Sequence, residues 1–442
     1  MTRLSARSLA LLVVAGMVLS GCGIEDWFSS TKTPPLPGKR VSVLLTDQTL
    51  QPDPHVVDVP VTLPTATANE MWPQPGGYPD HSMQQLVAGA TTELWHASFG
   101  TGTTSRRRLM ARPVIAEGRV YTMDSEFTVS AFDAKNGERL WETNVLPDDD
   151  SGDGFGGGVA FADGKLFVTS GYGDVLTLDP ATGKEGWRHN LSAPIRAGAT
   201  VADGRVFVVT VDNQLFALQA SDGTTIWTHN GILESAGLLN TTSPAVADGV
   251  VVVPYSSGEI FGLRVENGRV VWSDNLTVVR RVGALANLAD VSMPVIDHGL
   301  VIAVSHSGHL VAIDERGGSR VWDQELGGIE TPWLAGDFVF MLDNDQHLVA
   351  LTRQAGRVRW VSALDRWENP DDKTDPITWA GPVLGSGKLW LVSSTGQLIG
   401  VDAQTGTIIE KHDLPDGASL APVIANGTLY VVTDGGTLVA YR

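Results

Sequence analysis

The sequence predicts an all-β protein, an eight-bladed β-propeller whose last blade is closed by a strand from the N-terminal side of the chain. The main observation is a repeat that reads Ala-x-Asp-x-x-x-Gly-x-x-x-Trp or a close variant. Its seven glycine/aromatic pairs are Gly137/Trp141, Gly183/Trp187, Gly223/Trp227, Gly268/Trp272, Gly318/Trp322, Gly356/Trp360 and Gly406/Glu410, the last of which has lost the aromatic residue. Successive copies are 38 to 50 residues apart, which is the length of one four-stranded blade.

Short β-branched runs within each copy supply the strands. In the third copy, two such runs cover residues 205–210 and 214–218. Tight turns bound these runs at Asp163-Gly164, Asp203-Gly204, Asp248-Gly249 and Asn426-Gly427, where both residues accept a positive φ. The glycine of the repeat is expected to turn the third strand into the fourth, which carries the tryptophan.

The repeated tryptophan and aspartate have architectural explanations. An indole at the same place in nearly every blade is expected to fill the wedge between adjacent twisted sheets. The aspartates at the ends of the third strands are expected to accept backbone N–H bonds across the next turn rather than to act in catalysis, and they are Asp133, Asp179, Asp314 and Asp402.

The chain ends also predict how the ring closes. The eighth copy starts near Leu420 and stops at Arg442, where its fourth strand should follow. A matching strand lies upstream at residues 91–98, where Trp95 precedes Trp141 by 46 residues. Pairing of these two ends would complete eight blades and remove two exposed strand edges.

The N-terminus predicts the compartment. Arg3 and Arg7 precede an apolar stretch over residues 9–19, and Cys22, the single cysteine of the chain, follows it. This region resembles the lipobox of bacterial lipoproteins, which implies a signal peptide over residues 1–21, palmitate and diacylglycerol on Cys22, and, with Gly23 behind it, an outer-membrane location facing the periplasm. A single cysteine leaves no disulfide to form in an oxidising compartment.

Residues 22–90 are predicted to be a lipidated, proline-rich and partly extended tether, and residues 91–442 to be the propeller. One short strand is expected within the tether at residues 40–45, and residues 71–78 are expected to cap the ring. The formal net charge is −19 and becomes −21 without Arg3 and Arg7, so nucleic acid is not expected as a partner.

Motifs for catalysis and metal binding are weak. The chain has no Gly-x-Ser-x-Gly elbow and no phosphate-binding loop. Residues 149–154 resemble the start of a calcium loop, but Ala160 stands where a bidentate glutamate is needed. His306 and His309 straddle a predicted hairpin turn that would direct the two imidazoles apart. We therefore expect no metal ion, no cofactor and no catalytic residues.

The repeats resemble those of pyrroloquinoline-quinone (PQQ) dehydrogenase propellers, and together with the lipobox and the blade count the chain resembles the BamB family of lipoproteins. This resemblance implies a non-catalytic scaffold of the outer-membrane β-barrel assembly machinery (BAM complex). The implied partner is BamA, the barrel-forming subunit, bound through its periplasmic domains, with unfolded outer-membrane proteins as further candidates.

In that family the partner surface is formed by loops that lead into neighbouring central blades. The corresponding residues here are Ala236, Leu238 and Leu239 before the fourth copy and Asp290 before the fifth. Ala236-Gly237-Leu238-Leu239 stands where the family shows Leu-x-Leu-Arg, and Asp290-Val291-Ser292 where it shows Asp-x-Asp. The alternative is that the leucines only cover the end of the propeller.

Two other classes of protein remain open. A PQQ-dependent dehydrogenase shares the repeats, but the resemblance would then require a vicinal disulfide and a calcium site, and the chain has one cysteine. A periplasmic propeller that binds a ligand in its central funnel is the third class. Copurification with an outer-membrane barrel complex would separate these readings.

Overall fold

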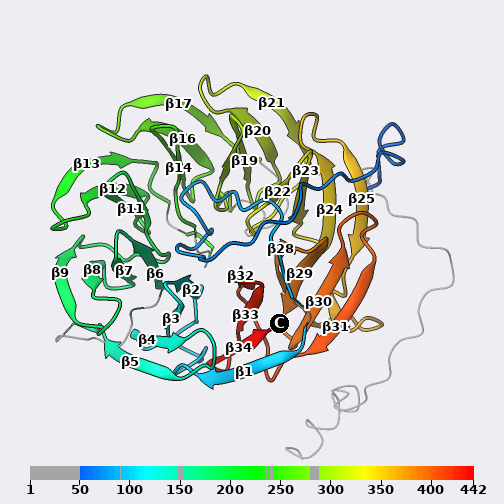
Figure 1. The fold of residues 1–442 in the computed structure, drawn as a ribbon. Coiled ribbons are helices and arrows are strands. Elements are labelled where there is room, and N and C mark those ends of the chain that lie inside the picture. The colour runs from blue at the N-terminus through cyan, green and yellow to red at the C-terminus, as the bar shows by residue number, and fades with distance from the viewer. Residues whose placement is uncertain are drawn as a thin grey trace, which may run out of the picture. The chain divides into compact units, whose positions relative to one another are not determined.

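The computed structural model describes residues 50–89, 91–147, 154, 156–234, 236–238, 242–278 and 288–442. These residues form strands, turns and connecting loops, and no helix occurs among them. Eight four-stranded antiparallel sheets stand around a central axis as the blades of a propeller (Figure 1). The predicted all-β class and the predicted number of blades are confirmed. The expected strand at residues 40–45 lies outside the described residues.

The first four blades follow the chain in order, each running from an inner to an outer strand. Blade 1 is β2 (Val114–Ala116), β3 (Arg119–Met123), β4 (Thr128–Asp133) and β5 (Arg139–Asn144). Blade 2 is β6 (Gly157–Ala162), β7 (Lys165–Ser170), β8 (Asp174–Leu178) and β9 (Glu185–Asn190). Blade 3 is β10 (Thr200–Ala202), β11 (Arg205–Val209), β12 (Gln214–Gln219) and β13 (Thr225–Asn230). Blade 4 is β14 (Ala245–Ala247), β15 (Val250–Pro254), β16 (Glu259–Arg264) and β17 (Val270–Asn275).

The next three blades repeat this plan, and the eighth is shared between the two ends of the chain. Blade 5 is β18 (Val295–Asp297), β19 (Leu300–Val304), β20 (Leu310–Asp314) and β21 (Arg320–Gln324). Blade 6 is β22 (Trp333–Ala335), β23 (Phe338–Leu342), β24 (His347–Thr352) and β25 (Val358–Ala363). Blade 7 is β28 (Trp379–Gly385), β29 (Lys388–Ser393), β30 (Gln397–Asp402) and β31 (Ile408–Asp413). Blade 8 is β32 (Val423–Ala425), β33 (Thr428–Val432), β34 (Thr437–Tyr441) and β1 (Glu93–Ser98).

Ring closure joins the two ends of the chain as predicted. Strand β1 pairs antiparallel with β34, with Trp95 opposite Ala440 and Ser98 opposite Thr437. Trp95 then packs on blade 1, where a Cβ added to Gly137 would come within 2.5 Å of its indole.

Each outer-strand tryptophan packs against the repeat glycine of the following blade. A Cβ at Gly183, for example, would lie 2.5 Å from the Trp141 ring, and the same conflict recurs around the ring up to Gly406 and Trp360. Each indole N–H also donates to a backbone carbonyl of that next blade at 2.7–3.3 Å, as Trp272 does to Glu315. A glycine is therefore needed at this position for two reasons: the backbone has a positive φ, and no side chain fits beneath the indole.

The repeat aspartates hold the turns between the third and fourth strands. The Asp179 carboxylate accepts the backbone N–H groups of Ala181 and Thr182 at 3.0 and 2.8 Å. Asp402 makes the same contacts with Gln404 and Thr405. Their predicted structural role is confirmed.

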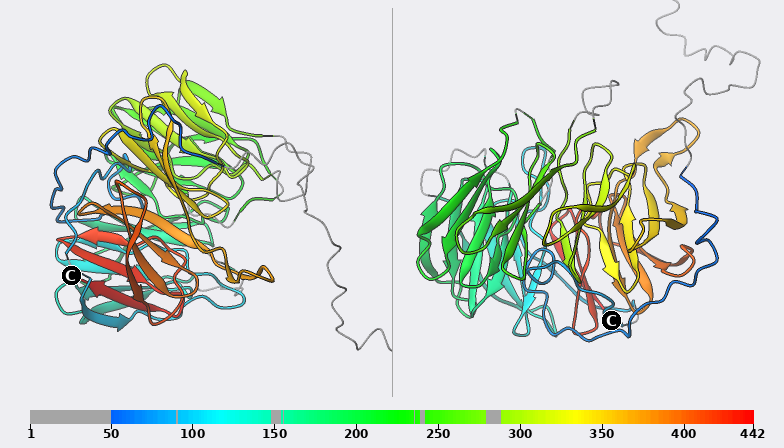
Figure 2. Two further views of the ribbon diagram at one scale, coloured as in Figure 1. Left: turned by 90° about the vertical axis from the view of Figure 1, so that its right-hand side faces the viewer. Right: turned by 90° about the horizontal axis from the view of Figure 1, so that it is seen from above.

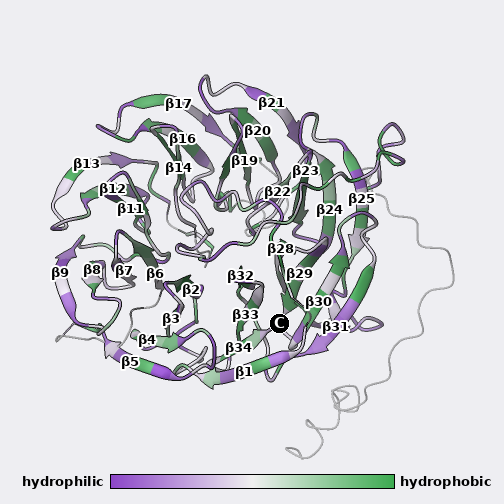
Figure 3. Ribbon diagram, in the orientation of Figure 1, coloured by the Kyte–Doolittle hydropathy of each residue, from purple (hydrophilic) through white to green (hydrophobic). Residues whose placement is uncertain are grey.

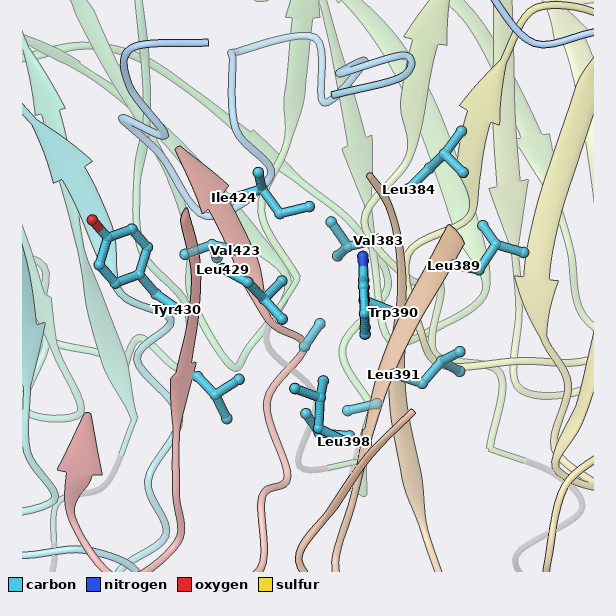
Figure 4. Packing of buried hydrophobic residues seen from close by; sticks show 14 of the residues in the cluster. Val383, Leu384, Leu389, Trp390, Leu391, Leu398, Val423, Ile424, Leu429 and Tyr430 are labelled. Atoms are coloured by element: carbon cyan, nitrogen blue, oxygen red, sulfur yellow. The ribbon is translucent and has the colours of Figure 1, made fainter. Parts of the chain in front are cut away.

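The core lies between neighbouring blades. Trp390, which is 1% exposed, and Tyr430, which is 2% exposed, belong to the cluster that fills the space between blades 7 and 8 (Figure 4). Hydrophilic residues gather on the outer strands, such as β5 and β9 (Figure 3), where exposed and half-buried residues alternate.

Residues 69–89, which we call the belt, cover the inner strands. The belt makes at least one hydrogen bond to each blade and follows the order of the blades around the axis. The contacts are Asn69 O with Asn426 N, Trp72 with Ile115, Pro73 O with Phe161 N, Gln74 with Val201, Pro79 O with Val246 N, Asp80 O with Ile296 N, Gln84 Oε1 with Gly336 N, Leu86 N with Leu384 O, and Gly89 N with Gly427 O. The belt therefore begins and ends on blade 8, and the expected cap at residues 71–78 is confirmed as part of it.

The belt marks one end of the propeller. It bonds to Gly336, Ser386 and Asn426, which lie in turns between the first and second strands of blades 6, 7 and 8. Figure 2 shows this blue segment along one edge of the ring. The loops that lead into each first strand and the turns between second and third strands lie at the other end, because antiparallel strands alternate in direction. This second end is called the loop end.

Two further segments complete the structure. Residues 50–59 run along the outer strand of blade 6, where the Asp53 N–H donates to Val358 O at 2.8 Å. A small hairpin of β26 (Trp367–Asn369) and β27 (Thr374–Pro376) precedes blade 7 at the loop end. Gly157 and Gly158 begin β6, and the close approach of the Gly198 backbone leaves no room for a Cβ on Gly158.

Candidate functional site

The loop end carries a cavity of about 240 Å³ between blades 3, 4 and 5. Its walls come from the loop after β9, the β11–β12 and β15–β16 turns, the loop between β13 and β14, and the loop before β18. Ala236, Leu238 and Asp290, three of the four residues expected to bind a partner, line it. The cavity thus brings together residues that are more than fifty positions apart in the sequence.

Hydrogen bonds fix the loop at Leu238. Its N–H donates to Asp290 Oδ1 at 3.0 Å, and its carbonyl accepts a hydrogen bond from the Arg196 guanidinium at 3.0 Å. The carbonyl of Asp290 accepts the N–H of His306 at 2.9 Å. One peptide segment is therefore held by blade 3 on one side and by blade 5 on the other.

Asp290 supports this loop from beneath. It is 6% exposed, and burial raises the pKa of its carboxyl. The hydrogen bond from the Leu238 N–H and the charges of His306 and Arg196 act in the opposite direction and lower this pKa. Burial also lowers the pKa of Arg196, an effect that Asp290 opposes. Asp290 Oδ2 and Thr242 Oγ1 are buried and accept or donate no hydrogen bond among the described residues.

Two aliphatic side chains project beside the cavity. Ile232 is 57% exposed and Leu233 is 71% exposed, the highest value among the large hydrophobic residues described. Two hydrogen bonds hold the backbone of Ile232, whose N–H donates to Glu259 Oε2 at 2.7 Å and whose carbonyl accepts from the Asn213 side-chain amide at 2.6 Å. The fold of the loop thus fixes the backbone at the start of this exposed pair. Sequence reasoning missed them, although two aliphatic residues directly after Asn230-Gly231 are a visible signal.

The other predicted residues are placed as follows. Ala236 is exposed and Leu238 is half-buried. Leu239, Cys22 and residues 149–153 lie outside the described residues. His306 and His309 have different partners, Asn344 Oδ1 at 3.2 Å and Asp323 Oδ1 at 2.8 Å.

The described residues also bear on two other kinds of site. No group of three or more His, Cys, Asp or Glu residues within them is placed to hold a metal ion. Within the same residues, no helix is long and apolar enough to cross a membrane.

Comparison with known proteins places the chain among propellers of one family. The family model described as outer membrane protein assembly factor BamB matches residues 85–145, 125–362 and 364–442. Proteins named outer membrane protein assembly factor BamB from Salmonella typhimurium and Escherichia coli are each 28% identical to it. The alignments cover 79% and 78% of this chain and 88% of each relative.

Solved structures and an enzyme relative add to this comparison. The crystal structure of BamB from Moraxella catarrhalis superposes with a TM-score of 0.67 at 20% identity and covers 80% of this chain and 99% of that one. A quinohemoprotein alcohol dehydrogenase from Comamonas testosteroni is 35% identical over 115 residues, which cover 24% of this chain and 16% of the enzyme. Its crystal structure is 15% identical with a TM-score of 0.66, covering 85% of this chain and 81% of that one, which shows a shared fold. The chain belongs to the family of the outer membrane protein assembly factor BamB.

Proposed function

We propose that the protein is a non-catalytic, lipid-anchored scaffold of the outer-membrane β-barrel assembly machinery that binds the periplasmic domains of the BamA-like subunit. Membership of the BamB family supports the general role. The observation that carries the partner surface is the pair of exposed aliphatic residues, Ile232 and Leu233, next to the cavity at the loop end, with the Ile232 backbone held by two hydrogen bonds.

The interface consists of an apolar rim and a polar base. Ile232, Leu233 and Ala236 form the rim together with half-buried Leu238, while Asp290 holds the loop in place from below. Leu239, the next residue in the sequence, is a further partner-binding residue in this proposal. Burying a few aliphatic side chains against a partner contributes about 1.5–3 kcal/mol each before the cost of association. Such a cluster is sufficient for the centre of a small interface.

Attachment to the outer membrane completes the proposal. Cys22 carries the lipid in this proposal, so the propeller is attached to the outer membrane and faces the periplasm. Several acyl chains anchor a protein stably where a single chain does not. Unfolded outer-membrane proteins are further partners of the assembled complex.

The position of the belt bears on the alternative of a ligand-binding propeller. The belt covers the first strands of all eight blades at one end, with Trp72 stacked on Trp333 at 6.1 Å between ring centroids. This occupancy disfavours a ligand-binding funnel at the belt end. A dehydrogenase would also need a cofactor cage, for which the described residues offer no metal-binding group.

A double substitution tests the partner surface. Leu238→Asp with Leu239→Asp should abolish binding of the mature protein to the periplasmic domains of the barrel-forming subunit, because it would bury unpaired carboxylates. Leu140→Asp is the matched control, since Leu140 is 45% exposed on β5 of blade 1, away from the loop end. Pull-down and thermal melting are measured together. Unchanged binding refutes the interface, and lost binding with a collapsed melting temperature assigns the leucines a structural role.

A further inference from the structure

The outer strand of each blade leaves one edge of its sheet without a neighbouring strand. In blade 3 this strand is β13, which stands last in the order β10-β11-β12-β13. Figure 1 shows β13 on the rim of the ring, with no described strand outside it. Its second edge therefore presents backbone N–H and C=O groups to solvent, and such an edge is a template for another extended chain.

Blade 6 shows how an outer strand of this propeller receives a further segment of chain. Residues 50–59 cover β25, and the Asp53 N–H donates to Val358 O at 2.8 Å. Arg359 Nε of the same strand donates to Val59 O at 2.5 Å. Among the described residues, no segment takes the corresponding place on β13. The outer edge of β13 is thus open where that of β25 is occupied.

Charge distinguishes β13 from the other outer strands. Proteins commonly protect a free edge with charged side chains, because an incoming strand would have to bury them. Each of the other seven outer strands carries at least one Asp, Glu, Lys or Arg residue, whereas β13 reads Thr-Ile-Trp-Thr-His-Asn and carries none. Burial lowers the pKa of His229, so its imidazole is neutral at pH 7. The edge of β13 is therefore the least protected of the eight.

The side chains on the outer face of β13 suit an apolar strand. Ile226 is 39% exposed, and Thr228 and Asn230 are exposed on the same face, since alternate residues of a strand point the same way. Beyond the strand, the chain continues to the exposed pair Ile232 and Leu233. Three exposed aliphatic side chains thus lie within eight residues of one uncharged edge.

The opposite face of β13 holds the strand in place. The half-buried Trp227 donates its indole N–H to Val265 O of blade 4 at 3.0 Å. His229 Nδ1 lies 2.8 Å from the Tyr255 hydroxyl oxygen, also of blade 4. The edge is therefore already extended and fixed before any other chain pairs with it.

We propose that the free edge of β13 binds an extended segment of an unfolded outer-membrane protein, which adds to blade 3 as a fifth strand. Strands of membrane β-barrels alternate apolar and polar residues, so the apolar side chains of the segment contact Ile226 while its backbone pairs with β13. Backbone pairing supplies the affinity in this mode of recognition, so segments of different sequence can bind. The choice of this occupant rests on the proposed function, because an assembly scaffold meets such segments before they insert into the membrane.

The test uses the mature full-length protein in detergent and a labelled peptide of about ten residues, the length of one membrane-spanning barrel strand. The peptide alternates Val, Phe and Tyr with Thr and Gln and ends in a polar, uncharged tail for solubility. We expect saturable binding and slower hydrogen exchange of residues 225–230 in the complex. The same peptide with N-methyl groups at its central residues keeps its side chains and loses backbone donors, so it should bind at least tenfold more weakly.

Lysines placed on the outer face of β13 give a matched pair of variants. Ile226→Lys with Thr228→Lys should weaken binding of the unmethylated peptide at least tenfold, because the incoming strand would have to bury the new charges. Leu140→Lys with Ser273→Lys puts the same two charges at the equivalent exposed positions of β5 and β17 and should leave the affinity within twofold. If the β13 variant melts early, the comparison of the two peptides on wild type decides alone.

The outcomes separate this inference from the proposed function. The inference is overturned by a peptide that does not bind wild type, by equal binding of the N-methylated peptide, or by protection of another outer strand in place of β13. It is also overturned if the periplasmic domains of the barrel-forming subunit protect residues 225–230 and the peptide does not, since the edge then belongs to that partner. A peptide that binds β13 of a wild-type protein unable to bind the periplasmic domains supports the edge site and overturns the proposed function.

Discussion

The Thr91 hydroxyl donates a hydrogen bond to Glu410 Oε1 at 3.2 Å, at the junction of blades 7 and 8. Glu410 holds the place that tryptophan occupies in the outer strands of the other blades. A tryptophan there would need a glycine turn between the third and fourth strands of the next blade. In blade 8 the fourth strand comes from the other end of the chain, so this turn does not exist. The loss of the aromatic residue in the seventh copy is therefore a consequence of ring closure.

Replacing a repeat glycine should destabilise the protein more than replacing a glycine in the turn between the first and second strands of a blade. In blade 3, Gly223 and Gly204 have φ of +77° and +69°, but a Cβ would meet Trp187 at 2.5 Å only at Gly223. Gly204→Ala should destabilise by about 1–2 kcal/mol through backbone strain alone. Gly223→Ala should destabilise the protein by roughly 1–3 kcal/mol more than this strain, because the new Cβ overpacks against the Trp187 indole. Equal free energies of unfolding in urea would contradict packing of the indole on the glycine.

The belt should contribute strongly to stability. Trp72 is 2% exposed, stacks on Trp333 and shares two backbone hydrogen bonds with Ile115. Trp72→Ala should lower the free energy of unfolding by about 3–5 kcal/mol because it leaves a cavity between the belt and the inner strands. Tyr78→Ala, at a belt residue that is 39% exposed, should change it little. A small effect of both, measured by thermal melting, would mean that the belt is only loosely attached.

Acid should destabilise the protein through His81. Its Nδ1–H donates to Pro294 O at 2.8 Å, and burial lowers the pKa of His81 to about 4 from 6.5. Between these two pH values the unfolded chain binds the extra proton, so stability is complete above pH 6.5 and falls as the pH drops toward 4. The loss is on the order of 3 kcal/mol. His81→Gln should remove this part of the pH dependence of Tm, and an unchanged slope would show that folding does not lower the pKa of His81.

Lipid attachment depends on Cys22 in our proposal. Cys22→Ala should give an uncleaved or soluble protein without palmitate label, because no acceptor thiol remains. Fractionation and labelling of cells that express the variant provide the measurement. A variant that still labels normally and stays with the outer membrane would rule out the lipobox.

Quinone chemistry should be undetectable. Purified protein with added PQQ and calcium should not reduce a dye in the presence of alcohols or sugars, since the sequence has one cysteine and no convincing calcium loop. A quinoprotein alcohol dehydrogenase assayed in parallel is the positive control. Measurable turnover by this protein would make an enzyme the better description.

The sequence predicted the blades because each one repeats the same physical solution. A glycine turn, an indole and an aspartate cap recur at a nearly constant spacing, and the missing fourth strand of the last copy had a single counterpart at Trp95. The belt was predicted only over residues 71–78. It makes one to several hydrogen bonds to each blade along an irregular path, and such a path leaves no periodic signal in the sequence.

The candidate site was harder to predict than the fold. The sequence pointed to the correct loops, but Asp290 is buried beneath Leu238 rather than presented to solvent. Ile232 and Leu233 follow the polar end of β13 and Gly231, and an aliphatic pair in a loop does not by itself show whether its side chains are buried or exposed. The hairpin of β26 and β27 was not predicted, since three-residue strands around Pro370 and two aspartates resemble a loop.

The belt is synthesised before the blades but can fold onto them only afterwards. Asn69 is among the first structured residues to leave the ribosome, yet its side chain donates to the carbonyl of Ile424, 355 residues later. Contacts of such sequence separation form slowly, because a long loop must close before they stabilise anything. The belt can therefore pack only on a complete ring, since the segment that is synthesised first binds to the eighth blade, which is synthesised last.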